Sequence, residues 1–279
     1  MENPFNPSFG TMPSVFLDHN SLSKRIIAEL NSRNSPFQTS LIYGQRGAGK
    51  TTLMTDVANE LSNAPHWQVV NLVLDDDILE SLLAQLREKL VDLRIFKDID
   101  LKIAFRGIQL DTKIGKTTNR ANFQTAFHRL LEKFTQKDIK ILITIDEVKA
   151  TPLLRKLISC CQVMLRDNLQ VSLLMAGLPE NVSEIQNDDV LTFLLRANRI
   201  TLTPLDAESI KSSYVRIFRT AGYRIDLPTL LYMTKQTLGF AYAFQLLGYC
   251  VWRVVESKDD KVITIKTIKE AADSYIQCH

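Results

Sequence analysis

The segment LIYGQRGAGKTTL, residues 41–53, constrains the fold of this chain more than any other. The apolar run TSLIY, residues 39–43, comes directly before Gly44, the first glycine of this segment, and is typical of a buried parallel strand. After Lys50 the apolar residues recur at helical spacing. A strand, a glycine-rich turn and a helix in this order predict an α/β sheet with a ligand-binding loop at its carboxyl edge.

The turn in this segment has the residue types that bind phosphate groups. Gly44, Gly49, Lys50 and Thr51 match the pattern G-x-x-x-x-G-K-[ST]. Glycine lets backbone amides approach an anion, and the helix beginning near Lys50 favours negative charge at its start. Lys50 is predicted to reach the β- and γ-phosphates and Thr51 to ligate Mg²⁺. The candidate nucleotide-binding residues, called the phosphate loop below, are Gly44, Gln45, Arg46, Gly47, Ala48, Gly49, Lys50, Thr51 and Thr52.

The alternative is a glycine-rich turn that carries an ordinary surface lysine. The strand before the turn and the helix after it argue against that alternative.

An acidic pair follows the most apolar run of the chain, IKILITI. Such a run is typical of a central parallel strand, so Asp146 and Glu147 are predicted at the edge of the sheet where ligands gather. Asp146 can hold the Mg²⁺ shell through water, and Glu147 can polarise an attacking water as a general base. A pair of acids that merely follows a strand is the alternative, and the phosphate loop upstream favours the functional interpretation.

Strand and helix patterns alternate up to about residue 203, and the remainder has only helical patterns. Predicted strands cover 39–43, 67–74, 139–147, 171–177 and 199–202. Predicted helices include 22–30, 50–61 and 78–93, one that ends near 134, and one that Thr151 caps. The sequence thus predicts a nucleotide-binding α/β domain over 1–203, with an extended leader and a hairpin insertion near 95–120. A helical lid domain is predicted over 204–279, with Asp206 capping its first helix and Gly222 just past the end of that helix.

Net charge and the absence of targeting patterns in the sequence bear on which partners and which compartment are expected. Lys and Arg total 34 against 31 Asp and Glu, so the net charge of +3 does not by itself indicate nucleic acid binding. Lys113, Lys116 and Arg120 form a local basic loop that is either a DNA-binding patch or a solvated loop. The N-terminus lacks a signal peptide pattern, and no apolar run has the length of a membrane span. A cytoplasmic protein with reduced cysteines and no membrane partner is therefore expected.

On these motifs the chain resembles the AAA+ branch of the P-loop ATPases. More narrowly it is similar to bacterial AAA ATPase-domain proteins related to origin-recognition and STAND-type ATPases. Further stretches that carry the resemblance are NPFNPSFG, LLMAGLPE, TFLLRANRITLTPL and TLGFAYAFQLLGY. The resemblance implies an α/β fold with a five-stranded parallel sheet flanked by helices, followed by a small helical lid. It also implies ATP with Mg²⁺ as the ligand and the roles given above for Lys50, Thr51, Asp146 and Glu147.

The resemblance further implies an arginine that reaches the γ-phosphate in a neighbouring subunit, hence a homo-oligomer. Arg196 and Arg199 are the candidates, and both remain open to the alternative of solvated charges at a strand end. Three stretches depart from the family pattern. Adenine contacts are expected from the segment that here has the sequence FLDHNSL, and a polar residue is expected at the end of the strand in LLMAGLPE. An arginine is expected in the lid stretch GFAYAF, where Tyr242 lies near that position. The end at His279 leaves little room for the winged-helix domain of some relatives.

Two functions follow as hypotheses. The first is a Mg–ATP-binding ATPase that couples binding and slow hydrolysis to lid movement and to a DNA or protein partner. The second is a nucleotide-gated interaction or DNA-binding module with little or no turnover, in which ATP and ADP act as switch ligands.

Overall fold

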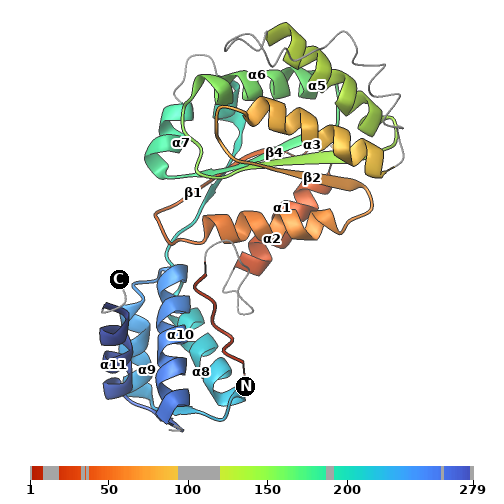
Figure 1. Ribbon diagram of the computed structural model, residues 1–279. Coiled ribbons are helices and arrows are strands. Elements are labelled where there is room, and N and C mark those ends of the chain that lie inside the picture. Colours follow the sequence, from red (N-terminus) through yellow and green to blue (C-terminus); the bar gives the residue numbers. More distant parts are fainter. Residues whose placement is uncertain are drawn as a thin grey trace. The chain divides into compact units, whose positions relative to one another are not determined.

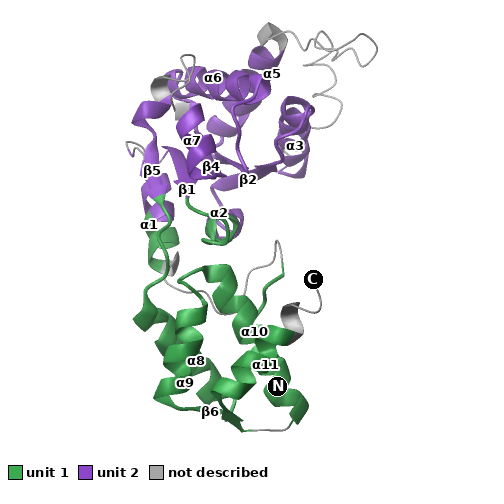
Figure 2. Cartoon of the chain, turned by 90° about the vertical axis from the view of Figure 1, so that its left-hand side faces the viewer, with its two compact units in different colours: residues 1–25, 44–56, 201–279 green, residues 26–43, 57–200 purple. Residues whose placement is uncertain are grey.

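A computed structural model of the chain describes residues 2–8, 19–32, 35, 38–93, 120–186, 192–258 and 261–276. The chain forms two compact units, which Figure 2 colours separately. Residues 26–43 and 57–200 make up the first, called the sheet unit. Residues 1–25, 44–56 and 201–279 make up the second, called the helical unit, so the phosphate loop belongs to the same compact unit as the C-terminal helices.

The sheet unit is built on a five-stranded sheet with the order β2-β3-β4-β1-β5. The strands are β1 (Thr39–Tyr43), β2 (Trp67–Leu72), β3 (Lys140–Ile145), β4 (Val171–Gly177) and β5 (Asn198–Thr201). β2 pairs with β3, β3 with β4, and β4 with β1, all in parallel. The predicted five-stranded parallel α/β fold is confirmed. β2 ends at Leu72, two residues earlier than predicted, and Val73 after it is largely exposed.

Helices flank this sheet (Figure 1). They are α1 (His19–Asn31), α2 (Lys50–Ser62), α3 (Ile78–Asp92), α5 (Arg120–Thr135), α6 (Pro152–Arg166) and α7 (Pro179–Gln186), with the 3₁₀ helix η2 (Thr192–Arg196). α3, α5 and α6 bury their apolar stripes in one core with the sheet, because continuous apolar strands need covering. The Thr151 hydroxyl accepts the N–H of Leu154 at 3.1 Å and caps α6, as predicted.

Two short elements of the sheet unit were not predicted from the sequence. α7 has eight residues and buries only Val182 and Ile185 within its described part. η2 has five residues and buries Leu194. Segments this short leave too few apolar positions for a periodic pattern, so only the tertiary packing reveals them.

The helical unit contains α8 (Ala207–Thr220), α9 (Leu227–Gln236), α10 (Ala241–Lys258) and α11 (Ile265–Ile276). Asp206 caps α8 by accepting the N–H of Ser209 at 2.9 Å, and Gly222 follows its end with a φ of 82°, both as predicted. The predicted helical character of this region is confirmed, with one addition that the sequence did not predict. β6 (Arg224–Ile225) and β7 (Val262–Ile263) form a parallel pair, and strands of two residues give no sequence signal.

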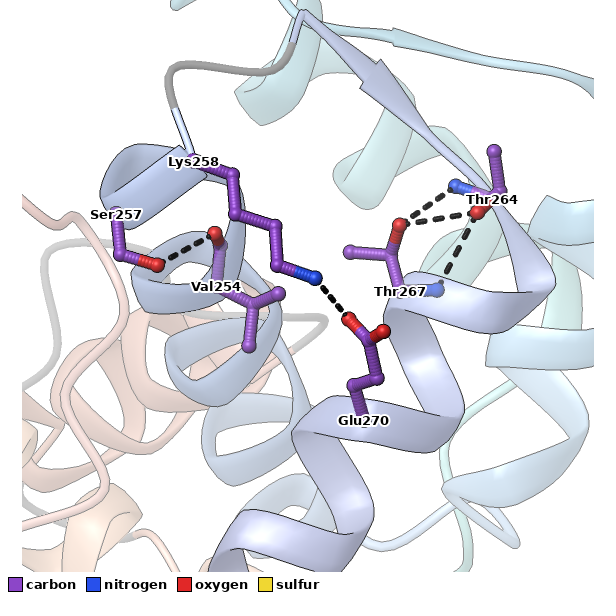
Figure 3. Close-up of polar contacts among 6 residues, drawn as sticks. All are labelled: Val254, Ser257, Lys258, Thr264, Thr267 and Glu270. Atoms are coloured by element: carbon purple, nitrogen blue, oxygen red, sulfur yellow. Dashed lines mark hydrogen bonds and ion pairs between the residues drawn. The ribbon is translucent and has the colours of Figure 1, made fainter.

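The start of α11 is fixed by local contacts, which Figure 3 shows. The N–H of Thr264 donates to the Thr267 hydroxyl at 3.2 Å, and the N–H of Thr267 donates to the Thr264 hydroxyl at 3.3 Å. One turn further on, Glu270 forms an ion pair with Lys258 at the end of α10. The ion pair joins the last two helices to each other.

The N-terminal leader contributes to the core of the helical unit. Residues 2–8 have no helix or strand, and Phe5 is buried among the aromatic rings of α8 and α10. The predicted hairpin near 95–120, with Lys113 and Lys116, lies outside the described residues. Arg120 begins α5. None of the helices in the described part of the chain is long and apolar enough to cross a membrane.

Candidate functional site

The phosphate loop follows β1 directly, and its last three residues, from Lys50 on, form the start of α2, as the sequence predicts. Gly47 and Gly49 have φ values of 77° and 92°. This left-handed region disfavours every residue with a Cβ, so both positions need glycine for backbone reasons. The loop therefore turns twice between a strand and a helix N-terminus, which is the geometry of an anion cradle.

Gly44 is required for a different reason, which is close packing. A Cβ added to Gly44 would lie 2.9 Å from the carbonyl oxygen of Leu202. Leu202 follows β5 in the chain, so the segment leading into the helical unit lies against the first residue of the loop. A side chain at this position would have to displace backbone.

The Lys50 ammonium lies over the beginning of the loop. Its Nζ donates to the carbonyl of Gly44 at 2.8 Å and to that of Gln45 at 2.9 Å. Both acceptors are neutral carbonyls, and a phosphate oxygen would form a stronger, charge-assisted hydrogen bond with the same cation. The donors of the loop thus fit a polyphosphate.

The other candidate residues of the loop have different environments. Gln45, Arg46 and Gly47 are exposed, Ala48 is buried, and Thr51 and Thr52 are half-buried in the first turn of α2. The N–H of Leu53 donates to the carbonyl of Gly49 at 2.9 Å, so the helix is regular from its start. The Thr51 hydroxyl, at this helix start, is the residue of the loop that could ligate Mg²⁺.

β3 ends at Ile145, two residues earlier than the predicted strand, so Asp146 and Glu147 directly follow it at the predicted edge of the sheet. The N–H of Glu147 donates to Oδ1 of Asp146 at 2.8 Å, and the N–H of Val148 donates to the Ala176 carbonyl at 2.9 Å. Glu147 is exposed and has a φ of 49°, a backbone conformation that costs about 1–2 kcal/mol in a residue with a side chain. Such backbone strain is frequent at functional sites, and Asp138, Asn168 and Leu238 share a positive φ in the described part of this chain.

The strands before the two motifs end at one edge of the sheet. β1 and β3 lie on either side of β4, with Tyr43 opposite Gly177 and Ile145 opposite Met175. The chain therefore leaves the sheet at its carboxyl edge both before the phosphate loop and before Asp146, which is where open α/β sheets bind ligands.

Two polar residues near this edge were not singled out from the sequence. The hydroxyl of Thr144 donates to Oδ1 of Asn71 at 2.7 Å, across the register that pairs β2 with β3. Thr144 is the second-last residue of β3 and precedes Asp146 by two residues in the chain. The available signal was one polar residue inside each of the apolar stretches VVNLVL and ILITI.

The beginning of α10 contacts the phosphate loop. The backbone N–H of Tyr242 donates to the carbonyl of Gly47 at 3.2 Å. A Cβ added to Gly47 would lie 3.4 Å from the Cβ of Tyr242. Tyr242, noted in the sequence as standing near the position of a lid arginine, thus lies against the loop, and its side chain is 46% exposed.

Arg196 and Arg199 are both exposed, at the end of η2 and within β5 respectively. Exposure is compatible with a finger that reaches a neighbouring subunit and equally with solvated charges. The two alternatives stay open at these positions.

Several solved structures share the architecture of this chain. Cdc6p from Pyrobaculum aerophilum matches 96% of this chain and 70% of its own, with a TM-score of 0.64 and 14% identity. The ORC2 protein of Aeropyrum pernix, solved in ADPNP and ADP complexes, covers the same shares with a TM-score of 0.62 and 11% identity. The Aeropyrum pernix ORC1 protein in complex with DNA matches 96% of this chain and 68% of its own, with a TM-score of 0.59 and 12% identity.

This chain has the AAA+ fold. No protein-family model matches the sequence, and a search of curated proteins found no significant match. The AAA+ likeness is therefore one of structure at low identity, and the residue roles depend on the geometry described above.

Proposed function

We propose that this AAA+ chain binds Mg–ATP in the phosphate loop. The observation that carries the proposal is the loop itself, with two left-handed glycines between a buried strand and a helix that starts at Lys50. Its exposed backbone and the Lys50 ammonium supply donors for the phosphates.

The individual roles follow from residue type and position. Lys50 exchanges its two loop carbonyls for phosphate oxygens, and backbone amides of the loop bind the remaining charge. Thr51 and Asp146 are the Mg²⁺-holding residues, the latter through water. Bound Mg²⁺ would neutralise charge on the β- and γ-phosphates. Glu147 is the general base that polarises the attacking water.

We propose slow hydrolysis coupled to movement of the lid, residues 204–279. Fast phosphoryl transfer uses a cation near the γ-phosphate. Where α10 meets the loop this chain has Tyr242 and not arginine. Arg196 or Arg199 of a neighbouring subunit would supply the missing charge if the chain assembles.

The test compares ATP affinity with ATP turnover for the parent, Glu147→Gln and Lys50→Ala. Turnover in the parent, with loss of turnover but retained affinity in Glu147→Gln, supports an ATPase. A general base contributes roughly 10²- to 10⁴-fold, which sets the expected loss. Lys50→Ala should weaken binding itself. If the parent does not bind ATP, the proposed function is wrong.

The second candidate is a nucleotide-gated module that acts on DNA. It is favoured by Tyr242 in place of a lid arginine and by the solved neighbour crystallised with DNA. The test measures duplex DNA affinity against salt concentration with ATP, with ADP and without nucleotide. A steep, ATP-dependent salt slope supports this candidate, because phosphate contacts release counterions. A slope that nucleotide leaves unchanged contradicts gating.

A further inference from the structure

The leader has a repeated local design. In Asn3-Pro4-Phe5 the Asn3 Oδ1 accepts the N–H of Phe5 at 3.0 Å. In Asn6-Pro7-Ser8 the Asn6 Oδ1 accepts the N–H of Ser8 at 2.9 Å. Each proline fixes one φ angle, and each asparagine closes its own turn. The segment is therefore ordered largely by itself and loses little conformational entropy when it docks.

Phe5 occupies a slot between α8 and α10. It is 1% exposed, and its ring centroid lies 5.5 Å from that of Phe218, 5.7 Å from Phe244 and 5.9 Å from Tyr214. Gly248 of α10 forms the floor, because a Cβ there would lie 2.4 Å from two ring carbons of Phe5. Glycine in a helix interior costs stability, and here the missing side chain makes room for the ring.

Polar contacts on both sides of the ring fix the register of the segment. Nδ2 of Asn3 donates to the Tyr249 carbonyl at 3.3 Å. The backbone N–H of Asn6 donates to Oε1 of Gln245 at 3.0 Å, and Gln245 is itself 7% exposed. The slot thus binds backbone as well as ring, as peptide-binding sites do. Figure 1 shows the leader, in dark red, running beside α8 and α10.

We propose that α8 and α10 form a peptide-binding slot whose ligand is the chain's own Asn-Pro-Phe-Asn segment. We further propose that its occupancy positions α10 against the phosphate loop. One helix carries both contacts, with Gln245, Gly248 and Tyr249 at the leader and Tyr242 at Gly47. The second statement rests on the proposed nucleotide function, and the first does not.

The slot is tested with the full-length Phe5→Ala variant and a labelled peptide, ENPFNPS. The peptide should bind this variant, and the parent should bind it at least tenfold more weakly, because its own leader competes at high effective concentration. The control peptide ENPANPS should bind neither protein. Equal binding to parent and variant, or no binding to a folded Phe5→Ala chain, would overturn the proposal.

A second experiment does not depend on the peptide. Phe5→Ala should lower the melting temperature by roughly 6–20 °C, the usual effect of removing a buried ring. Gly248→Ala should also lower it in the parent, because the methyl group closes the slot. In the Phe5→Ala background the same Gly248→Ala change should be neutral or stabilising, since the ring is gone. Additive losses would show that Gly248 does not accommodate Phe5.

The coupling is tested by ATP affinity. Phe5→Ala should weaken ATP binding several-fold, and saturating ENPFNPS should restore it. Met233→Ala, which removes a buried side chain of α9, is the control for general loss of stability. Adding ENPFNPS should not change the ATP affinity of this control variant. Unchanged ATP affinity in Phe5→Ala would refute the coupling between the slot and the phosphate loop, but would not contradict peptide binding in the slot. Absence of ATP binding in the parent would instead refute the nucleotide function.

Discussion

The backbone N–H of Tyr242 donates to the carbonyl of Gly47 at 3.2 Å, so the phosphate loop caps the first turn of α10. The first amides of a helix have no acceptor within the helix and need one from outside. The loop supplies one here, and in return its carbonyl is fixed in orientation. The conformation of the loop and the position of α10 are therefore coupled within the helical unit.

Replacing Tyr242 with proline should remove this hydrogen bond while leaving the helix largely intact, because proline is tolerated in a first turn. A net hydrogen bond contributes about 0.5–1.5 kcal/mol, so ATP affinity should fall by roughly 2- to 12-fold. The measurement is isothermal titration with a non-hydrolysable ATP analogue. Ala241→Pro is the matched control, one residue earlier in the same turn, and should keep the parent affinity. Equal losses in both variants would indicate a helix defect.

Gly47→Ala tests the backbone requirement of the loop. At a φ of 77° an alanine costs about 1–2 kcal/mol, and the loop should relax to a conformation that no longer binds phosphate. Gly222→Ala is the control, since Gly222 has a φ of 82° with no atom within 4 Å of an added Cβ. Both variants should lose similar stability in a denaturant titration. Only Gly47→Ala should lose ATP affinity, and retained affinity there would contradict the cradle.

A complementation experiment decides between the two alternatives for Arg196 and Arg199. A chain with Arg196→Ala and Arg199→Ala should bind ATP and lose turnover if either arginine acts in a neighbouring subunit. Mixing it with Glu147→Gln, which keeps both arginines, should restore part of the turnover at mixed interfaces. The solvated alternative would be favoured if the mixture were as inactive as its two components. It would also require that turnover per chain in the parent does not depend on protein concentration.

Glu270 gives the helical unit a pH dependence. Its hydrogen bond with Lys258 lowers the pKa of the Glu270 carboxyl below its ordinary value of 4.5. The ion pair therefore stabilises the folded state above about pH 4.5, and this contribution is lost as the pH falls through the folded-state pKa. Thermal melts between pH 3 and pH 6 should show a shallower acid loss for Glu270→Gln than for the parent. Glu256→Gln, an exposed glutamate of α10, should follow the parent curve.

The core elements followed from local patterns that need no tertiary context. Apolar runs predicted β1 to β4, the short stretch RITL predicted β5, and Thr151 and Asp206 marked helix starts that the structure confirms. The β6–β7 pair, α7 and η2 did not follow, because two to eight residues carry no periodic signal. The hydrogen bond between Thr144 and Asn71 was equally invisible, since it depends on strand register.

What the sequence determined by itself is the chemistry of the phosphate loop. Two glycines, a lysine and a threonine at fixed spacing allow few other structures, because backbone freedom and charge are properties of the residues themselves. Tertiary structure alone decided which distant segments lie against that loop and which residues receive the leader. Leu202 against Gly44, Tyr242 bonded to Gly47, and Phe5 in the space above Gly248 are contacts between residues far apart in the chain. Such contacts depend on the packing of whole helices, which no local pattern encodes.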